Sequence, residues 1–203
     1  MKEVVLLGKG DLFINIADWL YYNDYAIKAV APVIPEPQWC PSVKTWARNK
    51  NIKIIESGNY KDIKGEINLC ISVFYEKIIK QDFIDRCKKI INLHNSPLPK
   101  YRGVRPINWA LKNGEKTHGV TIHEISKGID DGPIYGQITY PIYPEIEEVK
   151  DVYEKSKKYG FNLFKEVIRV IDDIKPYPQD ESQATYYSNK DIKKLGDRSD
   201  FTR

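Results

Sequence analysis

The sequence predicts an α/β fold of the Rossmann-like kind, in which helices flank a mostly parallel sheet. Short apolar runs alternate with longer helical patterns over the first ninety residues, as such a sheet requires. Two strand-like segments of alternating pattern come later and predict an antiparallel pair. A long amphipathic pattern then predicts a long C-terminal helix.

The first part of the chain contains the parallel strands of this prediction. They are expected at residues 4–7, 26–33, 52–55, 67–72 and 89–93. The fourth is apolar on both faces, which is typical of a central strand. Helices are expected at residues 12–20, with Asp11 as the N-cap, at 43–49 and at 78–84.

The pattern changes after residue 93, where a Pro-rich loop begins. A helix at 106–112, strands at 120–125 and 134–142, and a helix at 149–171 follow. A length of 203 residues suits one domain, which we place at residues 1–175. Residues 176–203 read as a C-terminal extension or tail.

The composition is that of an ordinary globular protein, with 41% hydrophobic and 30% charged residues and a net charge of +4. The basic residues form no concentrated face, so no nucleic-acid partner is expected. No apolar run reaches the roughly 20 residues of a membrane span, so we expect a cytoplasmic protein without a membrane partner. Cys40, Cys70 and Cys87 lack metal-ligand spacing and are expected to be free thiols, with no metal site.

A glycine-containing turn, Gly8-Lys9-Gly10-Asp11, follows the first strand. Such a turn can point backbone N–H groups at a phosphate. The third glycine of the dinucleotide-binding motif is missing, and no acidic residue closes the second strand. A tight structural turn and a contact to phosphate or substrate therefore both stay open.

Asn92 and His94 lie two positions apart in the last parallel strand, so they share one face at its carboxyl end. Ligands of open α/β sheets bind beyond this end. The loop with Asp130 and Asp131 offers a carboxylate that could orient an imidazole. Asn, His and Asp together suit acyl or formyl transfer. The alternatives are a structural histidine and aspartates that only favour the turn.

The run from Ile91 to Gly103, followed by Gly119-Val120-Thr121-Ile122 and Asp130-x-Gly132, resembles the folate-dependent formyltransferase family. The resemblance implies that Asn92, His94 and Asp130 are catalytic, with Asp131 the weaker candidate. It also implies 10-formyltetrahydrofolate as the formyl donor and tetrahydrofolate as the product. A homodimer stays open as an assembly.

The same resemblance places the folate beside two segments. They are Phe74, Tyr75, Glu76, Lys77 and Ile78, and Ser126, Lys127, Gly128, Ile129 and Asp130. From its residues alone, the first segment suits a ligand wall and core packing equally.

The amino-acid sequence of residues 95–103 and 117–123 is similar to that of bacterial enzymes that formylate a nucleotide-linked amino sugar. These enzymes serve surface polysaccharide or glycan synthesis. A small-molecule nucleotide sugar is therefore the expected partner. Candidate residues for its phosphates are Lys9, Gly10, Lys100, Arg102 and Arg105. Arg102 suits the anchoring of its own loop equally well.

Other functions stay open. Glycinamide ribonucleotide is an alternative acceptor, and a tRNA acceptor is disfavoured because the chain is too short for the second domain of such enzymes. A folate-binding module without catalysis and a nicotinamide oxidoreductase are the remaining classes.

Overall fold

The computed structural model describes residues 2–196. The chain divides into two compact units. The first comprises the described residues up to Leu93 together with Glu124–Lys127. The second comprises His94–His123 and the described residues from Gly128 onward.

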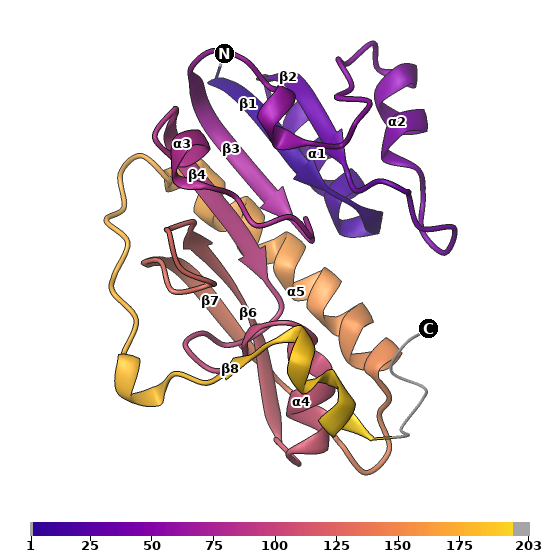
Figure 1. The fold of residues 1–203 in the computed structure, drawn as a ribbon, viewed down its shortest axis with the longest axis vertical. Helices are drawn as coiled ribbons and strands as arrows, with labels where there is room; N and C mark the ends of the chain where they lie inside the picture. Colours follow the sequence, from indigo (N-terminus) through magenta and orange to yellow (C-terminus); the bar gives the residue numbers. More distant parts are fainter. Residues whose placement is uncertain (1, 197–203) are drawn as a thin grey trace. The chain divides into compact units, whose positions relative to one another are not determined.

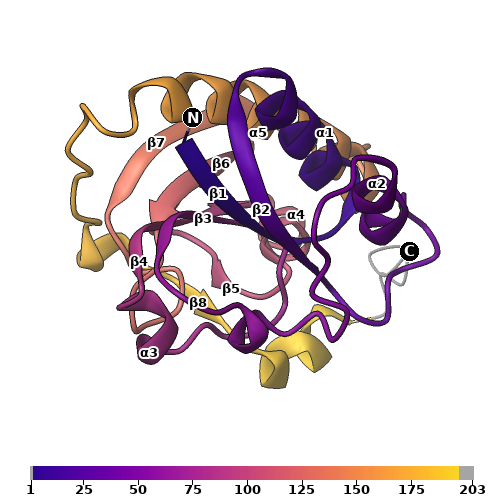
Figure 2. The same ribbon diagram turned by 90° about the horizontal axis from the view of Figure 1, so that it is seen from above.

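Four parallel strands form the sheet of the first unit, in the order β2-β1-β3-β4 (Figures 1 and 2). Their bounds are β1 (Lys2–Gly8), β2 (Tyr25–Pro32), β3 (Ile67–Val73) and β4 (Cys87–His94). The helices are α1 (Gly10–Tyr22), α2 (Val43–Asn49), the 3-10 turn η1 (Tyr60–Asp62) and α3 (Gln81–Ile84).

Helix α1 buries the apolar stripe that its sequence predicts, through Leu12, Phe13, Ile16, Ala17 and Leu20. It packs against β2, as does α2. A buried cluster that includes Val5, Leu7, Cys70 and Phe83 forms a hydrophobic core in this unit. Val5 and Leu7 lie two positions apart on β1 and thus share one face of the sheet.

Three sequence predictions for this unit were wrong in detail. Asp11 is not the N-cap of α1: Lys9 occupies that position without a side-chain cap, and Asp11 lies in the first turn. There its charge still interacts favourably with the helix dipole. Residues 52–55 form a single bridge, Val30 to Ile54, instead of a strand. The predicted helix at 78–84 is reduced to Gln81–Ile84.

The turn after β1 depends on Gly8 for its backbone conformation. Its φ of +147° is open to glycine, and a Cβ atom there would lie 1.9 Å from the carbonyl oxygen of Val73. The backbone N–H of Lys9 donates to the same oxygen at 3.2 Å. Close packing of two strand ends therefore requires this glycine.

The second unit contains the antiparallel pair, β6 (Thr117–Glu124) and β7 (Ile134–Pro141). The long helix α5 (Val149–Val170) packs against β7 and against α4 (Pro106–Lys112). The described strands of the first unit's sheet thus run parallel, whereas this pair in the second unit runs antiparallel. The predicted α/β fold with flanking helices and a long C-terminal helix is confirmed.

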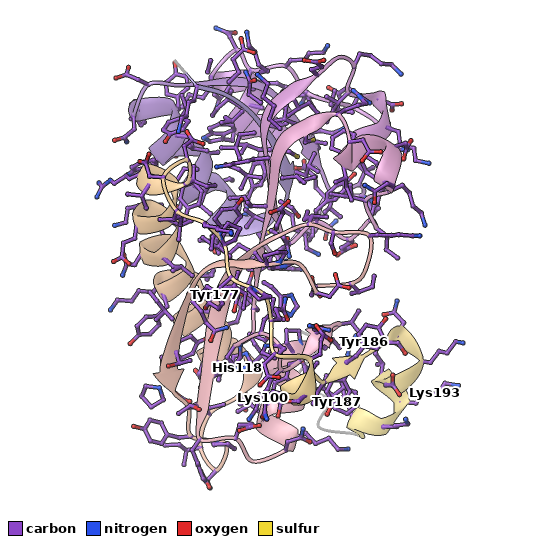
Figure 3. All side chains as sticks on the ribbon, turned by 90° about the vertical axis from the view of Figure 1, so that its left-hand side faces the viewer. Lys100, His118, Tyr177, Tyr186, Tyr187 and Lys193 are labelled. Atoms are coloured by element: carbon purple, nitrogen blue, oxygen red, sulfur yellow. The ribbon has the colours of Figure 1, made fainter. Side chains whose placement is uncertain are left out.

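The described part of the C-terminal extension is folded onto the second unit. Tyr177 exchanges two backbone hydrogen bonds with Ile134, of 2.7 and 3.0 Å. Strand β8 (Tyr186–Tyr187) pairs in parallel with β5 (Arg102–Gly103) between the turns η2 (Glu181–Gln183) and η3 (Asn189–Leu195). The ring of Tyr187 stacks on Trp109 at 4.1 Å, and Figure 3 marks its position.

No described helix combines the length and the apolar character that a membrane span needs.

Candidate active site

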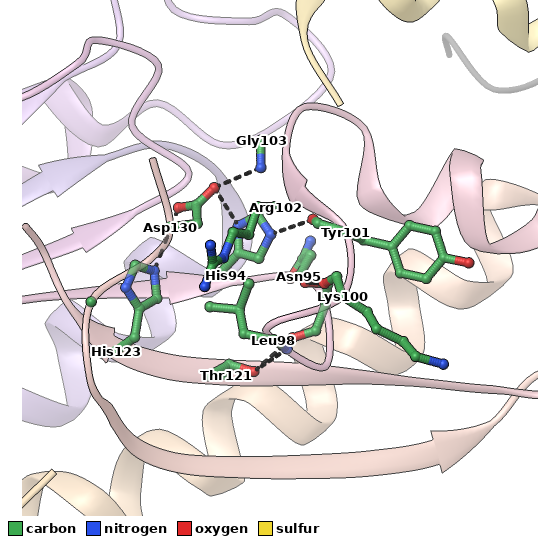
Figure 4. Close-up of polar contacts among 12 residues, drawn as sticks. His94, Asn95, Leu98, Lys100, Tyr101, Arg102, Gly103, Thr121, His123 and Asp130 are labelled. Carbon is green, nitrogen blue, oxygen red and sulfur yellow. Dashed lines mark hydrogen bonds and ion pairs between the residues drawn. The ribbon is translucent and has the colours of Figure 1, made fainter. Parts of the chain in front are cut away.

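His94 ends strand β4 and is buried, with 7% of its surface exposed. Its Nε2 donates to the backbone carbonyl of Tyr101 at 2.9 Å (Figure 4). Its Nδ1 lies 3.5 Å from Oδ2 of Asp130. Both ring nitrogens therefore face oxygen atoms that accept hydrogen bonds, which fixes the plane of the ring.

Asp130 lies between two histidines. Its Oδ2 faces His94, and its Oδ1 lies 3.5 Å from Nε2 of His123. The backbone N–H of Gly103 also donates to Oδ2, at 2.9 Å. Asp130 has a left-handed backbone with φ of +52°, which costs a residue other than glycine about 1–2 kcal/mol. The loop holds it there against this cost.

The electrostatic setting keeps Asp130 ionised. Burial raises the pKa of its carboxyl, but the charge of His94, a hydrogen bond and charge from His123, and the Gly103 amide together lower that pKa well below its usual value. Asp130 is therefore a carboxylate at neutral pH, able to orient an imidazole and to stabilise its positive charge.

Asp131 has a different environment from its neighbour. It is exposed, and a Cβ atom built on Gly128 would lie 1.9 Å from its Oδ2, so its carboxyl group folds back over its own loop. The structure thus brings Asp130, and not Asp131, to His94.

Asn92 is half-buried on β4, where it pairs in register with Ser72 of β3. Strand alternation places it on the same face as His94. Its amide can donate a hydrogen bond to an oxygen that gains negative charge.

His123 is a site residue that the sequence reasoning missed. It is 2% exposed, and its ring centroid lies 6.3 Å from that of His94. The signal was present in the sequence, since His123 lies at the end of the strand that leads into the Asp130 loop. The sequence does not show that this loop folds back over that strand end.

The Arg102 side chain anchors its loop. It is 8% exposed, and its guanidinium donates to Glu181 at 2.6 and 3.0 Å and to Gln179 at 2.8 and 3.1 Å. Two of these bonds form a bidentate contact to a carboxylate, which is a strong geometry for arginine. These contacts favour the anchoring role of Arg102 over phosphate binding.

The other candidates for phosphate binding differ in whether their side chains already form ion pairs. Lys9 forms an ion pair with Glu76, and Lys100 lies 3.9 Å from Glu115. Gly10 is buried in the first turn of α1. The half-buried side chain of Arg105 makes no hydrogen bond or ion pair within residues 2–196. Arg105 is thus the candidate with the most available charge.

The first predicted folate segment follows β3 at its carboxyl end. Phe74 has a left-handed φ of +57°, and Ile78 is 58% exposed. The Tyr75 hydroxyl donates to the carbonyl of Gly58 at 2.7 Å, and burial raises the pKa of this hydroxyl to about 12. Lys77 donates to the same carbonyl at 3.1 Å. The polar ends of Tyr75 and Lys77 therefore bind Gly58, whereas Ile78 leaves apolar surface exposed. Folate binding by this segment stays a prediction.

The second predicted folate segment is more open. Lys127 and Gly128 are exposed, whereas Ser126 and Ile129 are half-buried. Folate binding by this segment stays a prediction. Within residues 2–196, no group of His, Cys, Asp and Glu side chains could hold a metal ion, and the three cysteines are free thiols.

A cleft of about 250 Å³ lies in the second unit, lined in part by Lys100 and Tyr101. Its further lining residues are Pro97, Pro99, Glu115, Thr117, Thr139 and Gln183. Tyr101 borders this cleft, and its backbone carbonyl accepts a hydrogen bond from His94.

The model of the family described as formyl transferase matches residues 1–168 of the chain. A methionyl-tRNA formyltransferase from Fervidobacterium nodosum is 38% identical over 160 residues, which cover 79% of this chain and 47% of that protein. The chain spans about half the length of this curated relative.

Two solved structures share the fold. A sugar 3N-formyl transferase, WlaRD, studied with dTDP and 5-N-formyl-THF, has a TM-score of 0.85 at 31% identity, covering 95% of this chain and 71% of that one. An N-formyltransferase from Helicobacter canadensis, in complex with folinic acid and dTDP-3-aminofucose, has a TM-score of 0.84 at 28% identity, covering 95% and 72%.

Proposed function

Because the chain belongs to the formyl transferase family, we propose that it transfers a formyl group from 10-formyltetrahydrofolate to the primary amine of a nucleotide-linked amino sugar. Tetrahydrofolate is the second product. The observation that carries this proposal is the buried His94–Asp130 pair at the end of β4, with Asn92 two positions earlier on the same strand.

Each of these residues has a role in the proposed reaction. When bound, 10-formyltetrahydrofolate supplies the formyl group that moves from N10 to the acceptor amine. The Asn92 amide donates a hydrogen bond to the formyl oxygen as this atom gains negative charge. His94 holds the proton that the acceptor nitrogen loses and that N10 gains. Asp130 orients the ring and balances its charge.

The hydrogen bond between His94 and Tyr101 must open before His94 can act on a substrate through Nε2. Nε2 donates to the Tyr101 carbonyl, while Nδ1 faces Asp130. His94 therefore exchanges the Tyr101 carbonyl for a substrate atom when it acts through Nε2. Asp130 keeps its contact with Nδ1 during that exchange.

The nucleotide-sugar acceptor is supported by the two solved relatives, whose ligands include dTDP and dTDP-3-aminofucose. We propose that the phosphates of the acceptor bind Arg105, whose side chain has no ion pair within residues 2–196. The expected site of action is the cytoplasm, with surface polysaccharide or glycan precursors as products.

Methionyl-tRNA is the competing acceptor, because the curated relative with 38% identity has that activity in its name. The same groups on this chain would serve either acceptor, since both present a primary amine. The two proposals differ only in the molecule that carries the amine.

One experiment separates them. The purified protein is incubated with 10-formyltetrahydrofolate and, in parallel, with nucleotide-linked 3-amino and 4-amino sugars, glycinamide ribonucleotide and initiator methionyl-tRNA. Mass spectrometry then detects the gain of one formyl group. We expect this gain on an amino sugar and its loss in the Asn92→Ala variant. Formylation of methionyl-tRNA or glycinamide ribonucleotide alone would contradict the proposal.

A further inference from the structure

Gln179 connects the C-terminal extension to the Asp130 loop. Its side-chain Nε2 donates to the carbonyl oxygens of Asp130 and Gly132, both at 2.8 Å. Its Oε1 accepts from Nε and Nη2 of Arg102, at 3.1 and 2.8 Å. One amide group therefore makes four hydrogen bonds, which is its full capacity.

The orientation of this amide follows from its partners. Carbonyl oxygens only accept hydrogen bonds, and the guanidinium of Arg102 only donates them. The NH₂ group of Gln179 must face the Asp130 loop, and its oxygen must face Arg102. No other neutral side chain of this length offers two donors and an acceptor in this arrangement.

Arg102 holds the Gln179 side chain in place, because its own guanidinium is fixed. The guanidinium is nearly buried, and its bidentate contact to Glu181 holds its plane. The next residue, Gly103, donates its backbone N–H to Oδ2 of Asp130. Asp130 is therefore held through its backbone by Gln179 and through its carboxylate by Gly103.

We infer that Gln179 is a positioning residue for formyl transfer, acting through the backbone of Asp130. It clamps the two carbonyls of the loop so that the left-handed backbone of Asp130 directs the carboxylate at His94. This inference rests on the proposed function for its link to catalysis. Its structural part stands without that function.

The test uses the isosteric substitution Gln179→Glu in the full chain. Glutamate keeps an oxygen for Arg102, but it replaces the NH₂ group by an oxygen that faces two carbonyls. If Gln179 only anchored Arg102, this variant would behave like the wild type. If Gln179 clamps the loop, the variant loses that clamp, and Gln179→Ala loses both contacts.

Two control variants come from the same segment. Gln183→Ala removes an exposed glutamine from the neighbouring turn η2, and Glu181→Gln weakens the carboxylate contact to Arg102 while leaving Gln179 in place. Thermal unfolding of all variants shows whether each one is folded.

The first readout is hydrogen exchange of the Gly103 amide, followed by NMR without any substrate. We expect Gln179→Glu to speed this exchange about tenfold, because the Gly103 amide then loses its hydrogen bond to Asp130 and one ordinary hydrogen bond corresponds to about that factor. Gln183→Ala should leave the exchange unchanged. Unchanged exchange in both Gln179 variants would overturn the inference.

The second readout is steady-state kinetics with the acceptor found above. We expect kcat to fall about tenfold or more in both Gln179 variants with the folate KM within twofold, because a small misplacement of a catalytic group slows the chemical step. A wild-type kcat in Gln179→Glu would overturn the inference. If the wild type formylates no acceptor, the proposed function fails, and the exchange experiment alone decides on Gln179.

Discussion

Oδ2 of Asp130 lies 3.5 Å from Nδ1 of His94, and this contact joins a strand end to a loop 36 residues further along the chain. A carboxylate at that distance interacts favourably with a protonated ring. The charge of His94 is one of the causes that lower the pKa of Asp130, together with His123 and the Gly103 amide.

His94→Ala should lower kcat by about 100-fold to 10,000-fold, the usual contribution of a general acid or base.

Asn92→Ala should raise the activation barrier of formyl transfer by about 3–4 kcal/mol with little change in folate affinity, because the amide acts mainly on charge that develops in the reaction. Single-turnover rates and folate binding measured by fluorescence check both. A rate near that of the wild type in either variant would remove that residue from the mechanism.

Asp130→Asn should reduce the rate far more than Asp131→Asn, because the structure places only Asp130 beside His94. Asparagine keeps the shape and removes the charge, so the pH–rate profile should change as well. The adjacent Asp131→Asn variant is the matched control. A larger loss in that control would show that the wrong carboxylate has been assigned.

Arg105→Ala should raise the KM for the nucleotide sugar about tenfold and leave the folate KM within twofold, as expected for one charge-assisted hydrogen bond to phosphate. Lys100→Ala serves as the comparison, since its ammonium lies near Glu115. Equal effects of Arg105→Ala on both substrates would argue against phosphate binding by this residue.

His118 should make the fold sensitive to acid. It is fully buried, its Nε2 donates to the Asn95 carbonyl at 2.8 Å, and burial lowers its pKa to about 4. Between the ordinary histidine pKa of about 6.5 and pH 4, the unfolded chain takes up a proton that the folded chain does not, so stability falls as pH falls. The expected loss from pH 7 to pH 5 is about 2 kcal/mol.

Urea unfolding at pH 7 and pH 5 measures that loss, and His118→Gln should reduce it. Glutamine can donate to the same carbonyl but does not titrate in this range. An identical pH dependence in the variant would show that other groups cause the acid sensitivity. Asp130 contributes at lower pH, because a depressed carboxyl pKa gives stability that disappears only below its ordinary value near 4.

The fold could be predicted from the sequence wherever an element buries a long apolar face. Helix α1, strand β3 and helix α5 follow from the spacing of their apolar residues. Predictions of short elements were less accurate. At residues 52–55 a strand was predicted and a single bridge is present, because both give the same four-residue apolar pattern in the sequence. The predicted N-cap of α1 was wrong, because the sequence does not decide between Lys9 and Asp11 for that position.

The candidate site was predictable in part for a similar reason. Asn92 and His94 follow from strand alternation, and Asp130 from the family resemblance. His123 and Gln179 were not found. Gln179 lies 49 positions from Asp130 and 77 from Arg102, and no local pattern reports contacts over such separations. These contacts depend on how the extension folds back.

The pairing of β5 with β8 sets the size of the smallest fragment that can keep the second unit intact. Gly103 has φ of +90°, and a Cβ atom there would lie 2.1 Å from the Tyr187 carbonyl, so the two backbones pack directly against each other. A chain shortened to residue 175 would keep α5 but would remove every side-chain partner of the buried Arg102 guanidinium. A protease that cuts in residues 176–185 should therefore inactivate the protein without removing Asn92, His94 or Asp130. A shortened protein that keeps the pairing of β5 with β8 must extend beyond Tyr187.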